Sequence, residues 1–171
     1  ATNNVEDATA FFDRWLSFYP QDKNAVLGKL LIVDSQKQFD QGLTLTNKVL
    51  AKRPDAQLTL LKAYFHSRLG QAKPAWEIIN STADDVKALP FVRGVIARLH
   101  LIDKAPEQAV EHAQAAYDAT PNSDNALLLI AALEMSGKKA QAFTFLEKHV
   151  QAHSNDIPSA MLLAERQIGK D

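Results

Sequence analysis

Apolar residues recur at helical spacing in successive segments of the chain, and short polar stretches separate these segments. The segment "NAVLGKLLIVDSQ", residues 24–36, shows this spacing, and after a turn at "KQF" the pattern resumes in "DQGLTLTNKVLAKRP", residues 40–54. No segment alternates apolar and polar residues as a half-buried strand does. We therefore expect an all-α protein of about ten helices, arranged as helix–turn–helix pairs.

The pairs return with a period of 33 or 34 residues. Small residues mark this period at Ala8, Gly42, Ala75, Ala109 and Ala142. Four residues after each of them come Phe12, Thr46, Ile79, Ala113 and Leu146. Because small side chains let two helices approach closely, we expect the first set of residues where paired helices cross.

Glycine and proline recur with the same period, at the expected ends of the helices. Gly70 and Gly137 stand at expected helix ends, where glycine supplies a left-handed backbone, and Lys37 and Lys104 take the same place in other units. The ends of the second helices are marked by Pro20, Pro54 and Pro121, with Ser154 at the corresponding place. Polar residues at 122–124 and 154–156 are suitable helix caps.

Gly137 also begins "GKK", which looks like the end of a phosphate-binding loop. Such a loop needs an earlier glycine where this chain has Ala132, and a Ser or Thr where it has Lys139. We therefore interpret Gly137 as a turn between two helices.

The whole pattern resembles the tetratricopeptide repeat (TPR), in which small residues, a turn glycine and a closing proline recur at fixed places. One unit matches through Ala63, His66, Gly70, Ala75, Ile79 and Thr82. The next matches through Ala97, His100, Lys104, Ala109, Ala113, Ala116 and Pro121. The tryptophan of the family's first helix is replaced by Val26, Thr59, Arg93 and Ala126. The resemblance implies a right-handed α-solenoid of antiparallel helix pairs.

The resemblance makes residues 1–171 a single repeat array. Its register gives a half-repeat at 1–20, repeats at about 22–54, 56–88, 90–121 and 123–155, and a half-repeat at 157–171. In "NSTADDVKALP", residues 80–90, we expect a short helix followed by a loop or single turn. Pro90 disfavours helix at Leu89, so the next helix should not begin before this point. The half-repeats predict a fragment of a longer repeat protein, whose unpaired terminal helices could associate between molecules.

Composition and charge narrow the classes of partner. The 171 residues include 19 basic and 20 acidic side chains, for a net charge of −1, so the basic excess typical of nucleic-acid binding is missing. No apolar run reaches the length of a membrane span, and we expect no direct membrane insertion by this segment. The chain has no cysteine, which excludes disulfides and thiolate chemistry, and its first residues do not form a signal peptide.

Two groups of residues contain side chains that could form a zinc site or a hydrolytic triad. His149 and His153 have a spacing that can hold zinc, but no third ligand is evident, and we expect a solvated helix face. The run "HSND", residues 153–156, contains the residue types of a hydrolytic triad, yet sequence neighbours rarely reach that geometry, and helix capping is the simpler interpretation. Asp84 and Asp85 are interpreted as capping a turn.

Four large side chains fall at the packing places of the repeat. His66 and His100 occupy a place where the family has a packing aromatic, and Trp15 and Trp76 also fall at packing positions. We expect all four in the core. No catalytic, cofactor-binding or metal site is therefore predicted, and we expect no enzyme activity.

The resemblance implies that variable residues of the first helices line a concave binding face. These residues are Asn24, Leu27, Leu31, Asp34, Gln57, Leu60, Tyr64, Arg68, Phe91, Gly94, Arg98, Asp124, Leu127, Ala131 and Glu134. Family members that bind chaperone tails carry Lys, Asn and Arg at such places, which are mostly apolar here. Tyr64, Arg68, Phe91 and Arg98 better suit an extended or helical peptide. An alternative is that the leucines only pack neighbouring repeats.

The expected function is a non-catalytic scaffold that binds a peptide segment or partner protein. The alternative is an architectural spacer in a larger bacterial envelope, exopolysaccharide or protein-sorting assembly, and any enzyme activity would lie outside these residues. Segments such as "AMLLAERQIGKD" and "ALLLIAALEMSGKKAQA" look like long bacterial TPR lipoproteins of exosortase and exopolysaccharide systems. That likeness implies the periplasm or cell envelope rather than the cytoplasm.

Overall fold

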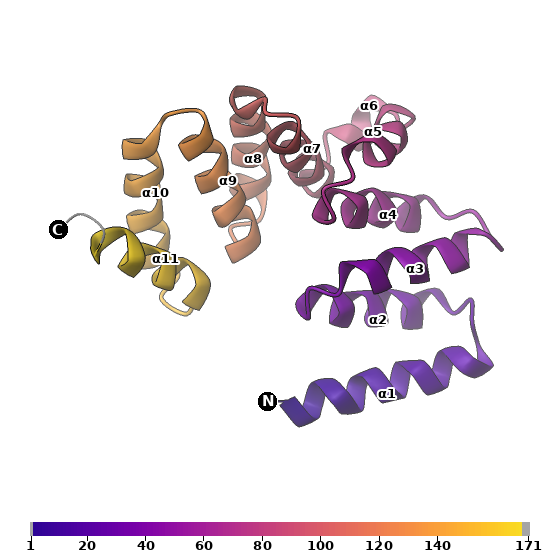
Figure 1. Ribbon diagram of the computed structural model, residues 1–171. Helices are drawn as coiled ribbons and strands as arrows, with labels where there is room; N and C mark the ends of the chain where they lie inside the picture. The colour runs from indigo at the N-terminus through magenta and orange to yellow at the C-terminus, as the bar shows by residue number, and fades with distance from the viewer. Residues whose placement is uncertain (1, 169–171) are drawn as a thin grey trace. The chain divides into compact units, whose positions relative to one another are not determined.

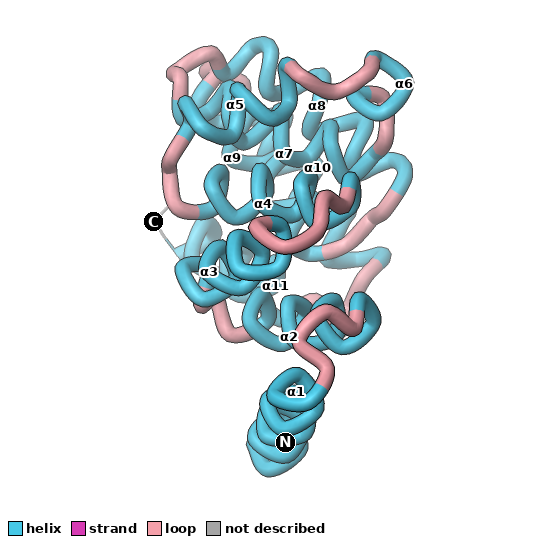
Figure 2. The backbone as a smooth tube through the Cα atoms, turned by 90° about the vertical axis from the view of Figure 1, so that its right-hand side faces the viewer, coloured by secondary structure: helices cyan, strands magenta, loops and turns pink. Residues whose placement is uncertain are grey.

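The computed structural model describes residues 2–168, which form eleven helices and no strand (Figure 1). The helices are α1 Thr2–Phe18, α2 Lys23–Ser35, α3 Phe39–Leu50, α4 Ala56–Arg68, α5 Ala72–Asn80, α6 Asp84–Lys87, α7 Pro90–Ile102, α8 Pro106–Ala119, α9 Ser123–Met135, α10 Lys139–Ala152 and α11 Ile157–Ile168. Figure 2 shows that short loops join them. The chain divides into two compact units, residues 1–78 and 79–171. The end of the expected last half-repeat, residues 169–171, lies outside the described residues.

The helices alternate in role. We call α2, α4, α7, α9 and α11 the first helices and α1, α3, α5, α8 and α10 the second helices, because each first helix is followed by a second one in the expected order. The segment that was expected to be irregular contains the end of α5 and the single turn α6. Pro90 then begins α7, where a missing N–H costs nothing.

Polar caps fix where the first helices begin. The side chains of Asp22, Asp55, Asn122 and Asp156 accept hydrogen bonds from the backbone N–H three residues later, at 2.9–3.1 Å. These caps start α2, α4, α9 and α11. The expectation that residues 154–156 cap a helix is confirmed at Asp156, and residues 122–124 do so through Asn122.

One left-handed residue ends four of the first helices. Lys37, Gly70, Lys104 and Gly137 have φ angles of 57°, 72°, 59° and 79°. In each case the following residue donates its N–H to a carbonyl of the helix, as from Lys138 to Leu133 at 2.8 Å. The interpretation of Gly137 as a turn residue is confirmed.

The first unit is held together by α1–α2, α2–α3 and α3–α4 contacts. Its core contains Val26, Leu30, Val49, Leu58 and Phe65, each at most 6% exposed. Two glycines let aromatic rings approach the helix backbone: Phe12 lies against Gly28, and Phe65 lies against Gly42. An ion pair between Lys29 and Asp13 also joins α2 to α1.

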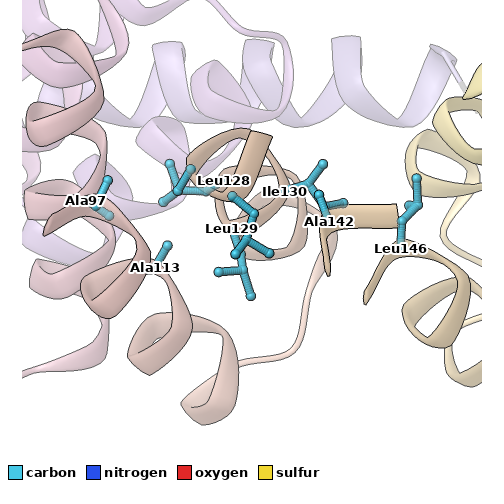
Figure 3. Close-up of a cluster of buried hydrophobic side chains, with 10 residues drawn as sticks. Ala97, Ala113, Leu128, Leu129, Ile130, Ala142 and Leu146 are labelled. Atoms are coloured by element: carbon cyan, nitrogen blue, oxygen red, sulfur yellow. The ribbon is translucent and has the colours of Figure 1, made fainter. Parts of the chain in front are cut away.

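The second unit is built from α7 to α11 around small side chains. The buried cluster shown in Figure 3 contains Ala97, Ala109, Ala113, Ala142 and the leucines and isoleucine of α9. Its alanines are at most 1% exposed, so the backbones of neighbouring helices approach closely. Of the five recurring small residues, Gly42, Ala75, Ala109 and Ala142 are buried, as expected of residues between packed helices, whereas Ala8 is half-buried.

Of the four side chains expected in the core, only His66 is buried. Trp15 is 41% exposed, because only one side of α1 is covered by α2, and its indole N–H donates to the capping carboxylate of Asp22 at 2.9 Å. The core prediction for Trp15 is therefore wrong, and Trp76 is half-buried. His66 is in the core, with Nδ1 2.6 Å from the Gln71 amide oxygen, whereas His100 is half-buried.

Candidate functional site

In the first unit, the predicted binding residues lie on α2 and α4. Leu31 is the most exposed of the apolar ones, with 73% of its surface accessible. Asn24 and Gln57 are also exposed, whereas Leu27 and Leu60 are half-buried. The set of predicted binding residues thus includes both solvent-exposed residues and residues that pack inside the unit. Leu27 belongs to the second group, because it packs against the core of the unit.

A polar cluster joins the C-terminal halves of these two helices. The Tyr64 hydroxyl donates to Asp34 Oδ1 at 2.6 Å, and Arg68 Nη1 donates to the Tyr64 oxygen at 3.0 Å. The Arg68 guanidinium lies 4.3 Å from the ring centroid of Phe39, in a cation–π contact. The sequence argument selected Asp34, Tyr64 and Arg68 but missed Phe39, which begins α3. These contacts hold the Tyr64 and Arg68 side chains in one geometry.

In the second unit, the predicted residues lie on α7 and α9. Phe91 is 45% exposed at the start of α7. Arg98 Nη2 donates to Asp124 Oδ2 at 3.0 Å, which links α7 to α9 through two predicted residues. Leu127 is half-buried and packs against the core cluster. The structure therefore brings Arg98 and Asp124 together and leaves a little under half of the Phe91 surface exposed.

Sequence reasoning missed the contribution of α11. Glu134, a predicted residue, accepts a hydrogen bond from Arg166 of α11 at 3.0 Å. Ile157, Met161 and Ile168 on the same helix are 67%, 60% and 76% exposed. A signal was present in the sequence, because Met161 and Ile168 lie one 34-residue period after Leu127 and Glu134. A cleft of about 360 Å³ lies beside the Glu134–Arg166 pair.

His149 is buried, not solvated. It is 2% exposed, so the expectation of a solvated helix face is wrong at this residue. Its Nδ1 lies 2.8 Å from the Tyr117 hydroxyl and its Nε2 lies 2.7 Å from Asp156 Oδ2. Asp156 also accepts hydrogen bonds from the backbone N–H and hydroxyl of Ser159. The cluster therefore joins α8, α10 and α11 through one imidazole.

The electrostatics of this cluster favour a structural role. Burial raises the pKa of the Asp156 carboxyl, but hydrogen bonds from His149 and Ser159 outweigh it and lower the pKa to about 2. Burial and nearby carboxylates raise the pKa of Tyr117. Both imidazole nitrogens of His149 already have protein partners, and the Ser159 hydroxyl faces the carboxylate instead of the imidazole. The Ser159 hydroxyl is therefore not positioned as a nucleophile on this histidine.

Metal binding and membrane insertion are two further possibilities for residues 2–168. No group of three or more His, Cys, Asp or Glu side chains in this range is arranged to hold a metal ion. No helix in the range has the length and apolar character needed to cross a membrane.

Known proteins were compared with the chain at the levels of sequence and structure. No protein-family model and no curated protein sequence matches it. Residues 41 to the end of MamA from Desulfovibrio magneticus RS-1 superpose with a TM-score of 0.60 at 16% identity, over 90% of this chain and 88% of that one. The ArsTM double mutant of MamA RS-1 gives a TM-score of 0.59 at 18% identity, over 91% and 89%. MamA is a TPR-like helical repeat protein.

The fold is a TPR-like α-solenoid. The expected fold class is thereby confirmed, and the eleventh helix is the single turn α6 that the sequence anticipated. The residues described above, from Leu31 and Tyr64 to Phe91 and Arg98, all lie on first helices.

Proposed function

We propose that this chain is a non-catalytic scaffold whose first helices bind a segment of a partner protein. The observation that carries the proposal is the exposure of large apolar side chains on those helices. Leu31, Phe91 and Met161 are 73%, 45% and 60% exposed, each on a different first helix. Each of them offers apolar surface whose burial by a partner segment would favour binding.

The surrounding polar groups are already ordered. Tyr64 is held by Asp34 and Arg68, and Arg98 contacts Asp124. Side chains held in place before binding lose less conformational entropy when a partner arrives. Tyrosine and arginine are also the residue types that contribute most at protein interfaces. Burial of one leucine-sized side chain is worth about 1.5–3 kcal/mol, so a few such contacts support measurable affinity.

The charges on these helices favour an amphipathic partner over an acidic tail. Arg98 and Arg166 contact Asp124 and Glu134, so opposite charges alternate on the first helices of the second unit. A carboxylate tail would have to compete with these carboxylates. A segment that offers apolar side chains with charges of both signs suits the surface better, in either extended or helical form.

The architectural alternative has one observation in its favour. Leu27 and Leu127 occupy corresponding places on α2 and α9, and both pack against the cores of their units. At those places, an apolar residue stabilises the packing of the helices and need not contact a partner. On this view the array spaces other parts of a larger assembly, such as one at a bacterial cell envelope, and its first helices carry no partner.

Photo-crosslinking distinguishes the two functions. A benzophenone amino acid is placed at Leu31 or Phe91, and adducts formed in fractionated source cells are identified by mass spectrometry. One dominant adduct is expected, and the adduct formed from a probe at Gln57, an exposed residue of the first helix α4 in the same unit, should disappear when Leu31→Asp is added. The matched control is Thr44→Asp, which places the same charge on an exposed residue of the second helix α3. Adducts unaffected by Leu31→Asp, or formed only with copies of the same chain, would support the spacer.

A further inference from the structure

Two histidines face each other where α7 packs on α8. The ring of His100, near the end of α7, stacks on the ring of His112, in the middle of α8, with centroids 5.6 Å apart and 22° between the ring planes. The interface around them is closely packed, because Ala97 on α7 and Ala109 and Ala113 on α8 are fully buried. The two half-buried imidazoles therefore contribute to the packing between these helices.

The other repeats carry apolar side chains at the same two places. His100 and His112 are twelve residues apart, one on the first helix and one on the second helix of a repeat. The corresponding pairs are Val33 and Leu45, His66 and Ile78, and Leu133 and Phe145. Each of those pairs has at least one apolar member. The α7–α8 repeat is thus the one of these four in which both members can acquire a charge.

The position of the His112 ring suits a neutral imidazole. Its Nδ1 is buried and has no hydrogen-bond partner among the residues that the structure describes. A neutral imidazole has one nitrogen without a proton, which has no hydrogen bond to donate. Protonation would place an N–H at Nδ1 without an acceptor, and a buried donor without a partner is costly. The packing of this ring therefore favours the neutral form.

Charges within the α7–α8 pair act on the two rings in both directions. Burial lowers the pKa of His100 and of His112 below the ordinary value of 6.5, and the His100 ring and Arg93 on α7 lower that of His112 further. Asp103, directly after α7, raises the pKa of His100, and Glu111 on α8 raises that of His112. Burial outweighs both carboxylates. Two protonated rings at this distance would also repel each other.

The charged side chains of the other helices packed on this pair have partners of their own. α9 packs on α7 and α8, and α6 packs on α7. Their ion pairs are Asp124 with Arg98, Glu134 with Arg166, and Lys87 with Asp84. The remaining carboxylate, Asp85, accepts the N–H of its neighbour Val86. The charge state of the histidine pair is therefore governed mainly by the groups of α7 and α8.

We propose that His100 and His112 form a pH-sensitive contact that loosens the α7–α8 pair in mildly acidic solution. At neutral pH both rings are neutral and pack as an aromatic pair. As the pH falls through 6.5, imidazoles in an opened state take up protons that the packed state resists. The stability from this contact is therefore complete above that pH and decreases below it. Since α7 also carries Phe91 and Arg98, its loosening alters the first-helix surface of the second unit.

Hydrogen exchange at about pH 7.5 and about pH 5.5 tests the proposal. The rates are corrected for intrinsic exchange at each pH, so that they report opening of the helices. Exchange in α7 and α8 should become several-fold faster at the lower pH, with a limit of about tenfold for each histidine and pH unit. The internal control is the pair α2 and α3, which contains no histidine and should not change. Equal behaviour of the two helix pairs would overturn the proposal.

The repeats also supply a matched variant. His100→Leu combined with His112→Phe installs the residues that stand at the corresponding places of the α9–α10 repeat, where Leu133 is buried and Phe145 packs against the core. Exchange in α7 and α8 of this double variant should be independent of pH. Acceleration at about pH 5.5 that persists in the double variant would overturn the assignment to the two histidines.

Nuclear magnetic resonance titration of the unmodified chain tests the pair even where the double variant does not fold. The imidazole signals are assigned with His100→Gln and His112→Gln. Both rings should remain neutral at pH values at which an exposed imidazole is already protonated. Titration of both rings at the ordinary value of 6.5 would overturn the proposal.

Discussion

At the scale of single residues, one tight constraint is the approach of Phe65 to the α3 backbone at Gly42. A Cβ at Gly42 would lie 2.5 Å from that ring, and Phe65 is 1% exposed, so the ring has little room to move. Gly42→Ala should destabilise the protein by about 1–2 kcal/mol in urea unfolding, since overpacking outweighs the better helix propensity of alanine.

The control is Gly94→Ala, where the nearest atom to a new Cβ is 3.6 Å away. That change should stabilise the protein by about 0.5–1 kcal/mol. Equal effects of the two substitutions would show that Phe65 adjusts freely.

The left-handed turns make a second prediction at this scale. Lys37 and Lys104 adopt φ angles of 57° and 59°, which side chains with a Cβ rarely take. Lys104→Gly and Lys37→Gly should each stabilise the protein by about 0.5 kcal/mol, and Gly137→Ala should destabilise it by about 1 kcal/mol. Thermal unfolding measures the shifts. Lys48→Gly, in the body of α3, is the control and should be destabilising; stabilisation there would mean that the turn geometry is irrelevant.

The sequence located these turns but not every side chain. Gly70 and Gly137 were identifiable because the period and the glycine signal agree. Trp15 was misplaced because a repeat pattern assigns the same environment to every unit, whether or not a neighbouring helix covers it. The same limit affected the candidate site, where Leu27 and Leu31 were both selected although one packs and the other is exposed.

At the scale of elements, the buried His149–Asp156 pair fastens α11 to α10. The pKa of Asp156 in the folded protein is about 2, below the ordinary aspartate value of 3.8. A lowered carboxyl pKa contributes stability that is complete above about pH 4 and is lost as the pH falls towards 2. The size of the contribution is about 2 kcal/mol, because each unit of pKa shift is about 1.4 kcal/mol. The Asp156 side chain is 7% exposed, so solvent screening is small.

Asp156→Asn should therefore remove about 2 kcal/mol of the stability loss between pH 4 and pH 2 and should lower stability at pH 7. Chemical unfolding at a series of pH values measures both effects. The matched control is Asp84→Asn, because the Asp84 side chain is 97% exposed and should leave the pH profile unchanged. An unaltered profile in Asp156→Asn would assign the acid sensitivity to other carboxyls.

The helices were predictable from the sequence, but the buried contacts of His149 were not. Helix starts follow from local caps such as Asp156, which lie within a few residues of the groups that they bond. The contact between Tyr117 and His149 spans 32 residues, and no short-range pattern marks it. The spacing of His149 and His153 suggested solvent exposure on a helix face, but burial depends on α8 and α11, which the spacing does not represent.

At the scale of the whole molecule, each described helix packs mainly against its neighbours in the chain. The extensive contacts join consecutive helices, or two helices with one helix between them in sequence, such as α7 and α9. Such an array behaves as a row of units coupled to their neighbours, and local openings need not spread. The effects of Gly42→Ala and Asp156→Asn should therefore be additive to within about 0.5 kcal/mol, because the two sites share no partner.

Hydrogen exchange under native conditions separates local from global opening. Gly42→Ala should speed exchange in α2 to α4, where Gly42 and Phe65 make their contacts, and leave α9 to α11 unchanged. Asp156→Asn should speed exchange in α10 and α11 and leave α2 to α4 unchanged. A uniform rise in all helices for both variants would show that the chain opens as one cooperative unit. In that case, nearest-neighbour coupling would not describe this solenoid, because local packing losses would be shared along its length.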